Sequence, residues 1–274
     1  MRRTGKKKDV GRGGRMAGLR KRLEKEPVLL FVYFLLRFSV IAVLVLQCLN
    51  GNYYNVFLCV LTLILLTIPS IIEHRLKIEI PNTLEIIVIV MVFSAEILGE
   101  ISSYYTKYPG WDTALHTLTG FLTAAVGFSI VELMNRSSRN LSLSPFFVCL
   151  FSFCFSMMIG VLWEFFECMM DYFFFLDMQK DSIVSSIHSV TLDPENLGRV
   201  VHVWDVENVS VNGVPLPIGG YLDIGLYDTM KDLAVTFIGS VTYSLFGFFY
   251  LTGKSKGHFF RKFILTWDDE GEKE

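Results

Sequence analysis

Gly160-Val-Leu-Trp-Glu164-Phe-Phe-Glu167-Cys-Met-Met-Asp171 ends a long apolar run, yet it contains three carboxylates. Glu164, Glu167 and Asp171 are spaced i, i+3 and i+7, so an α-helix places all three on one face. Carboxylates within an apolar segment of membrane-spanning length are energetically costly and usually mark a functional site. This stretch therefore predicts a membrane helix that carries a polar site.

The composition of the whole chain also indicates a membrane protein. Its 274 residues are 52% hydrophobic, 14% aromatic and 19% charged, and the mean hydropathy is +0.45. Typical soluble domains carry about 25% charged residues. The five cysteines lie in or beside apolar segments and form no Cys-x-x-Cys pair. We interpret them as small apolar side chains, not as a disulfide framework or a zinc site.

Six apolar segments are long enough to cross a hydrocarbon core of about 30 Å as helices. A backbone in lipid must satisfy its own hydrogen bonds, which leaves helices or closed barrels, and these segments are too long for barrel strands. The sequence thus predicts an all-α fold, a polytopic transmembrane helical bundle of about six spans. The predicted spans are residues 27–49, 53–72, 80–101, 112–134, 145–171 and 224–251.

Basic residues indicate the orientation of these spans. Residues 1–26 are rich in Lys, Arg and Gly. We predict a disordered cytoplasmic tail there, and not a nucleic-acid-binding arm, because a span follows at once. Lysines and arginines also favour alternate connections and the C-terminal tail, residues 253–274. The positive-inside rule then places both termini in the cytoplasm.

The longest connection, residues 172–223, falls on the outer side and is rich in acids. Within it, residues 206–211 alternate between apolar and polar, and Asn212-Gly213 follows. This pattern favours two strands joined by a two-residue type I′ turn. We therefore predict a small extracytoplasmic hairpin. A connection of this length is more often functional than idle, and we expect it to cap the bundle.

The predicted orientation also gathers polar residues from three spans at the outer end of the bundle. Each span contributes two residues that share a helical face. Carboxylate ligands favour Mg²⁺, Ca²⁺ or Mn²⁺, and an imidazole admits zinc or iron. We predict a divalent-metal site in which Glu164 or Glu167 acts as a general base for a metal-activated water. The candidate ligands are Asp112, His116, Glu164, Glu167, Asp228 and Asp232.

Each of these polar residues also has a structural interpretation. Asp112 and Asp223 are placed to cap helices. Lys231 lies beside two acids and can pair with one of them. In the structural interpretation, His116 forms a hydrogen bond between helices and has no ligand role. These alternatives stay open from the sequence.

Two further features lie within the spans. Arg37 is in the middle of the first span and needs an acidic partner or water, and Asp232 and Glu96 are the candidates. Three glycines are predicted to allow close helix packing. They are Gly120, Gly127 and Gly239.

Three motifs combine the candidate residues. They are Trp111-Asp112-xxx-His116-xxx-Gly120, Trp163-Glu164-xx-Glu167, and Gly220-Tyr221-x-Asp223 followed by Asp228-xxx-Asp232 and Ile238-Gly239-Ser240. Together they resemble the YjdF-type family of uncharacterised bacterial inner-membrane proteins. The resemblance covers about residues 80–240. It implies a multi-pass protein of the bacterial plasma membrane and no established activity.

Three functions remain open from the sequence. The first is a metal-dependent hydrolase or transferase that acts on a lipid or envelope precursor at the outer leaflet. The second is a cation or proton transporter, although transporter sites usually lie near the membrane midplane and these acids gather at one end. The third is a non-catalytic structural membrane protein. The expected partner is the lipid bilayer, with no nucleic acid.

Overall fold

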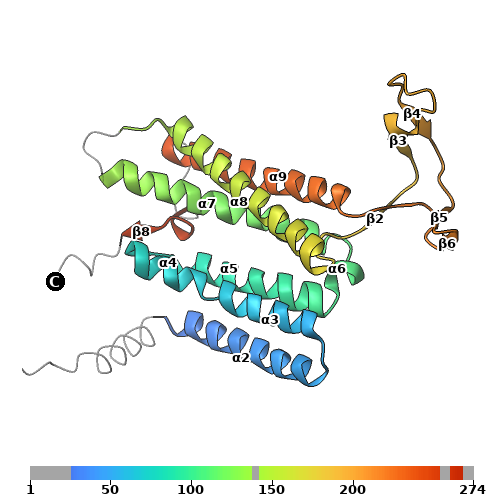
Figure 1. Cartoon of the computed structure of the whole chain (residues 1–274). Helices are drawn as coiled ribbons and strands as arrows, with labels where there is room; N and C mark the ends of the chain where they lie inside the picture. Colours follow the sequence, from blue (N-terminus) through green and yellow to red (C-terminus); the bar gives the residue numbers. More distant parts are fainter. Residues whose placement is uncertain (1–25, 138–141, 254–259, 268–274) are drawn as a thin grey trace, which may run out of the picture. The chain divides into compact units, whose positions relative to one another are not determined.

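The computed structural model describes residues 26–137, 142–253 and 260–267, which belong to two compact units (Figure 1). Unit 1 contains residues up to Leu115, Phe128–Val148 and the residues from Gly247 onward. Unit 2 contains His116–Gly127 and Cys149–Phe246. The predicted basic tail, apart from Glu26, and most of the predicted C-terminal tail lie outside the described residues.

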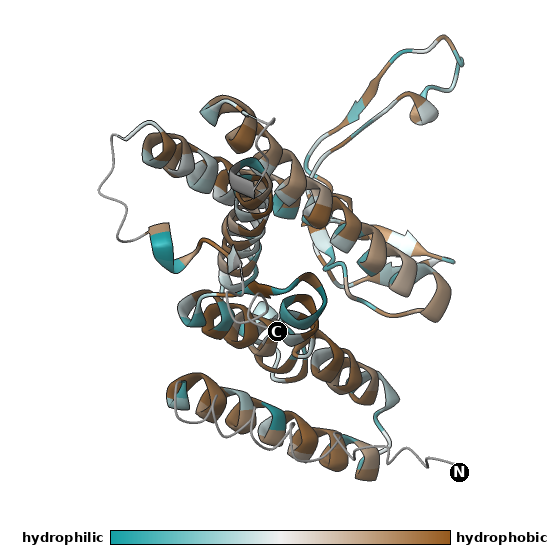
Figure 2. Ribbon diagram, turned by 90° about the vertical axis from the view of Figure 1, so that its left-hand side faces the viewer, coloured by the Kyte–Doolittle hydropathy of each residue, from teal (hydrophilic) through white to brown (hydrophobic). Residues whose placement is uncertain are grey.

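Within the described residues, five helices are long and apolar enough to cross a membrane. They are α2 (Pro27–Leu49), the pair α3 (Tyr53–Leu65) and α4 (Ile68–Leu76), α7 (Trp111–Ser137), α8 (Pro145–Phe174) and α9 (Leu226–Leu251). Hydrophobic residues run along these helices (Figure 2), and many of their large apolar side chains are exposed, as in Phe38 and Phe165. Exposed apolar helix surfaces suit contact with lipid. The predicted all-α membrane bundle is confirmed.

The third predicted span, residues 80–101, is built differently from the others. Its α-helix α5 (Asn82–Phe93) ends after 12 residues and continues as the π-helix η1 (Ser94–Ile101). The wider turn is visible at its end, where the Ser102 N–H donates to the Ile97 carbonyl, five residues earlier, at 3.0 Å. Because the α-helix changes type at Ser94, this segment is not among the five candidate spans.

Unit 1 packs α2 against α3 and α5 around an apolar cluster. The Tyr33 hydroxyl donates to Glu85 Oε1 at 2.8 Å within this packing. Arg37 donates to the Leu66 carbonyl at 3.3 Å, and its guanidinium lies 5.0 Å from the centroid of the Tyr33 ring. The sequence left the partner of Arg37 open between Asp232 and Glu96, and within unit 1 the described contacts of its guanidinium are of another kind. They are a carbonyl at the break between α3 and α4 and an aromatic ring.

Unit 1 also contains short elements around these helices. α6 (Tyr104–Lys107) follows η1. Near the end of the chain, η3 (Phe260–Lys262) precedes β8 (Thr266–Trp267), which pairs antiparallel with β1 (Ile78–Glu79). The Leu265 N–H donates to Ser129 Oγ at 3.0 Å, so the segment just before β8 is bonded to α7 within this unit.

Unit 2 joins parts of α7, α8 and α9 through unusually close backbone contacts. A Cβ atom on Gly239 would lie 2.0 Å from the Thr117 carbonyl oxygen, and one on Gly120 would lie 2.2 Å from the Thr236 carbonyl oxygen. Only glycine fits at such distances. Ser156 Oγ lies 2.6 Å from Ser240 Oγ and donates to the Gly120 carbonyl at 2.8 Å. The predicted close packing at Gly120 and Gly239 is confirmed, and hydroxyl groups reinforce it.

The α8–α9 connection, residues 175–225, consists of short strand pairs and loops that extend beyond the ends of α8 and α9 (Figure 1). Its pairs are β2 (Ser182–Val184) with β7 (Tyr221–Asp223), β3 (Ile187–Ser189) with β4 (Val201–Val203), and β5 (Val209–Val211) with β6 (Val214–Leu216). The 3-10 turn η2 (Val190–Leu192) follows β3.

The hairpin predicted at Asn212-Gly213 is present between β5 and β6. Asn212 and Gly213 have φ angles of +53° and +80°. Two positive φ angles in succession are the backbone of a type I′ turn, so this part of the prediction is confirmed. The other two strand pairs of the connection were not predicted.

Candidate functional site

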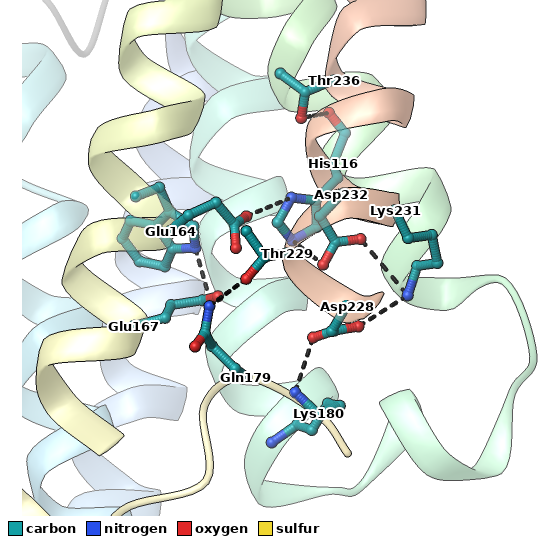
Figure 3. Close-up of polar contacts among 11 residues, drawn as sticks. His116, Glu164, Glu167, Gln179, Lys180, Asp228, Thr229, Lys231, Asp232 and Thr236 are labelled. Atoms are coloured by element: carbon teal, nitrogen blue, oxygen red, sulfur yellow. Dashed lines mark hydrogen bonds and ion pairs between the residues drawn. The ribbon is translucent and has the colours of Figure 1, made fainter. Parts of the chain in front are cut away.

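Five of the six predicted site residues lie together in unit 2 (Figure 3). α7 supplies His116, α8 supplies Glu164 and Glu167, and α9 supplies Asp228 and Asp232. Their spacing along each helix turns both members of a pair toward the same side. The four carboxylate residues are buried, with relative exposures between 1% and 9%.

The sixth predicted residue, Asp112, lies in the first turn of α7. His116 follows it one helical turn later on the same helix. One potential ligand atom of Asp112 lies within 4.8 Å of one of His116. The i, i+4 spacing seen in the sequence thus brings these two side chains together along one face of α7.

The His116 ring lies between two carboxylates from different helices. Its Nδ1 atom is 3.8 Å from Glu164 Oε1, and its Nε2 atom is 3.8 Å from Asp232 Oδ2. Both distances exceed the usual hydrogen-bond length of about 2.7–3.2 Å. Thr236 Oγ1 donates to the His116 backbone carbonyl at 3.3 Å, which ties this turn of α7 to α9. Each ring nitrogen therefore faces a buried carboxylate across a short gap.

Asp228 has a different environment from Asp232, although both lie on α9. Its Oδ1 atom accepts from Lys231 Nζ at 3.0 Å, and its Oδ2 atom accepts from the backbone N–H of Lys180 at 2.8 Å. Lys231 Nζ also lies 3.5 Å from Asp232 Oδ1. The lysine thus contacts both acids, whereas the sequence suggested a single pair. Both oxygens of Asp228 are engaged by protein groups.

Glu167 lies one turn beyond Glu164 on α8. Its Oε1 atom accepts a hydrogen bond from Trp163 Nε1 at 2.8 Å. Trp163 belongs to the same helix, so this contact fixes the rotamer of Glu167 locally. The tryptophan was recognised in the sequence only as part of a motif, and its hydrogen bond to Glu167 depends on side-chain rotamers that spacing does not reveal.

The first residues of the α8–α9 connection are fastened beside this cluster. Asp171 accepts hydrogen bonds from the backbone N–H groups of Met178 at 2.7 Å and Gln179 at 2.8 Å. The Gln179 side-chain amide donates to Thr229 Oγ1 on α9. Gln179, Lys180 and Thr229 were missed in the sequence, because their contacts depend on the path of the chain after α8.

The cluster gathers four buried carboxylate residues in one small region. Lys231, which is about half exposed, and His116, when it is protonated, lie close to them. Burying uncompensated like charges is unfavourable, so a cluster of this kind takes up protons or a cation. One imidazole with several carboxylate oxygens is a donor set that suits a divalent metal.

Comparisons with known proteins show which family contains this site. No curated protein and no solved structure matches the chain. A family model does match residues 31–253, a range that includes all the residues of the cluster. The chain therefore belongs to the membrane-protein family described as "Predicted membrane protein (DUF2238)".

Proposed function

We propose that the His116 cluster binds a divalent metal ion and supports hydrolysis or group transfer on a lipid or envelope precursor. The observation that carries this proposal is the position of the His116 ring, with a buried carboxylate 3.8 Å from each nitrogen. Ligand atoms that share one metal at about 2.0–2.2 Å lie roughly 3–4 Å apart. A metal ion beside the ring thus requires only small side-chain movements.

The two sides of the ring suggest two different roles. A metal-ligating histidine usually donates its other N–H group to a carboxylate, which fixes the tautomer and the ring orientation. We assign Nε2 and Asp232 to the metal and Glu164 to the orienting role at Nδ1. Asp112, one turn before His116 on the same helix, is the further ligand that we expect. Asp228, which is held by Lys231 and the Lys180 amide, becomes a positioning residue.

Such a metal would supply Lewis acidity and lower the pKa of a bound water. The residue that we assign as general base is Glu167, which is buried and is oriented by Trp163. The same metal set could serve Mn²⁺ or Zn²⁺, with Mg²⁺ less suited to an imidazole ligand.

The packing beside the cluster favours a binding site over a transport path. Thr236, one turn after Asp232 on α9, has its carbonyl against Gly120 and its methyl group against Gly160. A Cβ atom on Gly120 would meet the Thr236 carbonyl at 2.2 Å. Directly beyond the carboxylates, α9 is therefore in close contact with α7 and α8, which supports a binding site more than a transport path.

The cellular setting of this proposal comes from the sequence. The three motifs suggest a YjdF-type protein of the bacterial plasma membrane, and the basic N-terminal residues suggest cytoplasmic termini. With that orientation the cluster faces the outer leaflet, where lipid and envelope precursors would be its substrates.

The first test is elemental analysis of the purified full chain after incubation with Mn²⁺ or Zn²⁺ and removal of free metal. We expect a stoichiometric metal in the wild type, its loss in His116→Ala, and a metal affinity weakened about 10–100-fold in Glu164→Gln. Asp171→Asn is the matched control, since its acid binds backbone amides, and it should retain the metal. A wild type that stays metal-free, or a His116→Ala variant that keeps the metal, would overturn the proposal.

A further inference from the structure

A second cluster of potential metal ligands lies in the α8–α9 connection, well apart in sequence from the cluster above. β3 and β4 place His188 directly opposite His202 in register. Their Nδ1 atoms are 3.0 Å apart, and both side chains are exposed. Trp204 lies against this pair, with ring centroids 4.5 Å from His188 and 6.0 Å from His202.

The separation of the two nitrogens matches that of two ligands on one metal ion. Two imidazole nitrogens bound at about 2.0–2.1 Å are roughly 2.9 Å apart at a right angle and roughly 3.4 Å apart at a tetrahedral angle. The observed 3.0 Å lies within this range. Without a metal, one nitrogen donates a hydrogen bond to the other. A single hydrogen atom then lies between the two nitrogens, where a cation could bind.

Pairing of β3 with β4 holds the two histidines opposite each other. Directly opposite residues of an antiparallel ladder keep their Cβ atoms about 4.5–5.5 Å apart. Rotating the two rings about their Cβ–Cγ bonds is then enough to direct both lone pairs toward a common point. Trp204 packs nearly parallel to His202, with an interplanar angle of 12°, which limits the side on which the rings are open.

We propose that His188 and His202 form a bidentate site for a transition-metal cation, with Cu²⁺ bound more tightly than Zn²⁺. Cu²⁺ has the highest affinity in the divalent series and accepts ligands at right angles in a square plane, which the 3.0 Å separation fits best. Water fills the remaining positions, so the ion is exchangeable. This site is independent of the metal proposed at His116.

The test is a Cu²⁺ titration of the full chain in lipid nanodiscs. Binding is measured by the quenching of tryptophan fluorescence, because Trp204 lies against the pair. All variants carry His116→Ala, so that binding at the other cluster does not contribute. Loss of an outer-shell partner alone costs about 10–100-fold in affinity, so His202→Gln should weaken binding at least about tenfold. His74→Gln is the matched control, since His74 is an exposed histidine on α4.

Electron paramagnetic resonance of the Cu²⁺ complex gives a second measurement. We expect nitrogen splitting from two imidazoles in the His116→Ala background and from at most one in His202→Gln. Equal Cu²⁺ affinity with and without His202 would overturn the proposal. A spectrum with a single nitrogen in the His116→Ala background would do the same.

Discussion

The acids of unit 2 fall into two regions with different partners. In and beside the α8–α9 connection, carboxylates accept hydrogen bonds from backbone N–H groups. Asp171 binds the amides of Met178 and Gln179, and Asp223 binds the amide of Tyr227 at 2.8 Å. In the helical region, Glu164 and Asp232 face the His116 ring at 3.8 Å. The same chemical group is thus hydrogen-bonded by backbone N–H groups in one region and faces a side chain in the other.

The difference follows from what a helix can offer. Inside a helix, the backbone N–H groups are already bonded to carbonyls four residues earlier, so none is available to a carboxylate. In a loop, successive N–H groups are free to converge on one acid. Asp228, in the first turn of α9, is intermediate, because it receives one amide from Lys180 and one ion pair from Lys231. A carboxylate in mid-helix therefore needs another side chain, a proton or a bound cation.

The largest expected effect is a difference in metal affinity between the two kinds of acid. Asp232→Asn removes a proposed ligand oxygen and should weaken Mn²⁺ binding by about 100-fold or more, beyond the range known for outer-shell partners. Asp171→Asn changes an acid that binds only amides and should change affinity by less than about threefold. Isothermal titration calorimetry on the purified full chain measures both. An equal loss of Mn²⁺ affinity in the two variants would show that the two kinds of acid do not differ in metal binding.

The next effect concerns stability, and here the variant at Asp171 is expected to show the change. Asp171→Ala leaves the amides of Met178 and Gln179 without their acceptor, and Met178 is buried. Leaving a buried donor unsatisfied costs about 1–3 kcal/mol, so we expect a lower unfolding midpoint in detergent. Metal bound to the His116 cluster should remain stoichiometric. A variant that unfolds normally but loses its metal would show that Asp171 belongs to the other group.

The helices and their polar faces were predictable from the sequence, because both depend on local periodicity. Apolar run length indicated α2, α8 and α9, and the i, i+3 and i, i+4 spacings indicated which acids share a face. The Asn212-Gly213 turn was predictable for the same reason, since its two residues favour positive φ angles. These features need only neighbouring residues.

Features that depend on the three-dimensional path of the chain were not predictable. The change to a π-helix at Ser94 has no signature in composition. The contact of Arg37 with the Leu66 carbonyl was not predictable, because it depends on the break between α3 and α4. The roles of Asp171 and Gln179 also depend on where the chain turns after α8. Long-range contacts of this kind are decided by packing.

Lys231 offers a smaller test of the helical group. It is about half exposed and lies near both Asp228 and Asp232, where it would compete with the proposed cation. Exposed ion pairs contribute about 0.2–1 kcal/mol, so Lys231→Gln should strengthen Mn²⁺ binding by roughly two- to fivefold at low salt. The gain should shrink as salt screens the charge. Weaker binding in this variant would instead indicate that the lysine organises the site.

The smallest expected effect separates two acids of the α8–α9 connection by pH. The backbone amide of Arg199, together with those of Glu195 and Leu197, lowers the pKa of Asp193. Partial burial, followed by the charges of Asp177, Asp171 and Asp223, raises the pKa of Asp181.

A lowered folded pKa means that ionised Asp193 stabilises its turn above the unfolded value of about 3.9, and that this contribution is lost as the pH falls through the folded pKa. A raised folded pKa means that ionised Asp181 opposes folding, so protonation on the way down to about pH 4 relieves that cost. Below about pH 4, amide hydrogen exchange at residues 195–199 should therefore accelerate in the wild type relative to Asp193→Asn, in which position 193 no longer titrates. In residues 177–181, amide hydrogen exchange should instead slow as the pH falls, because protonation of Asp181 removes an unfavourable charge. If residues 195–199 and residues 177–181 both lose protection as the pH falls, the backbone amides do not set Asp193 apart from Asp181. Hydrogen bonding by the backbone would then fail to explain how the acids of the connection are stabilised.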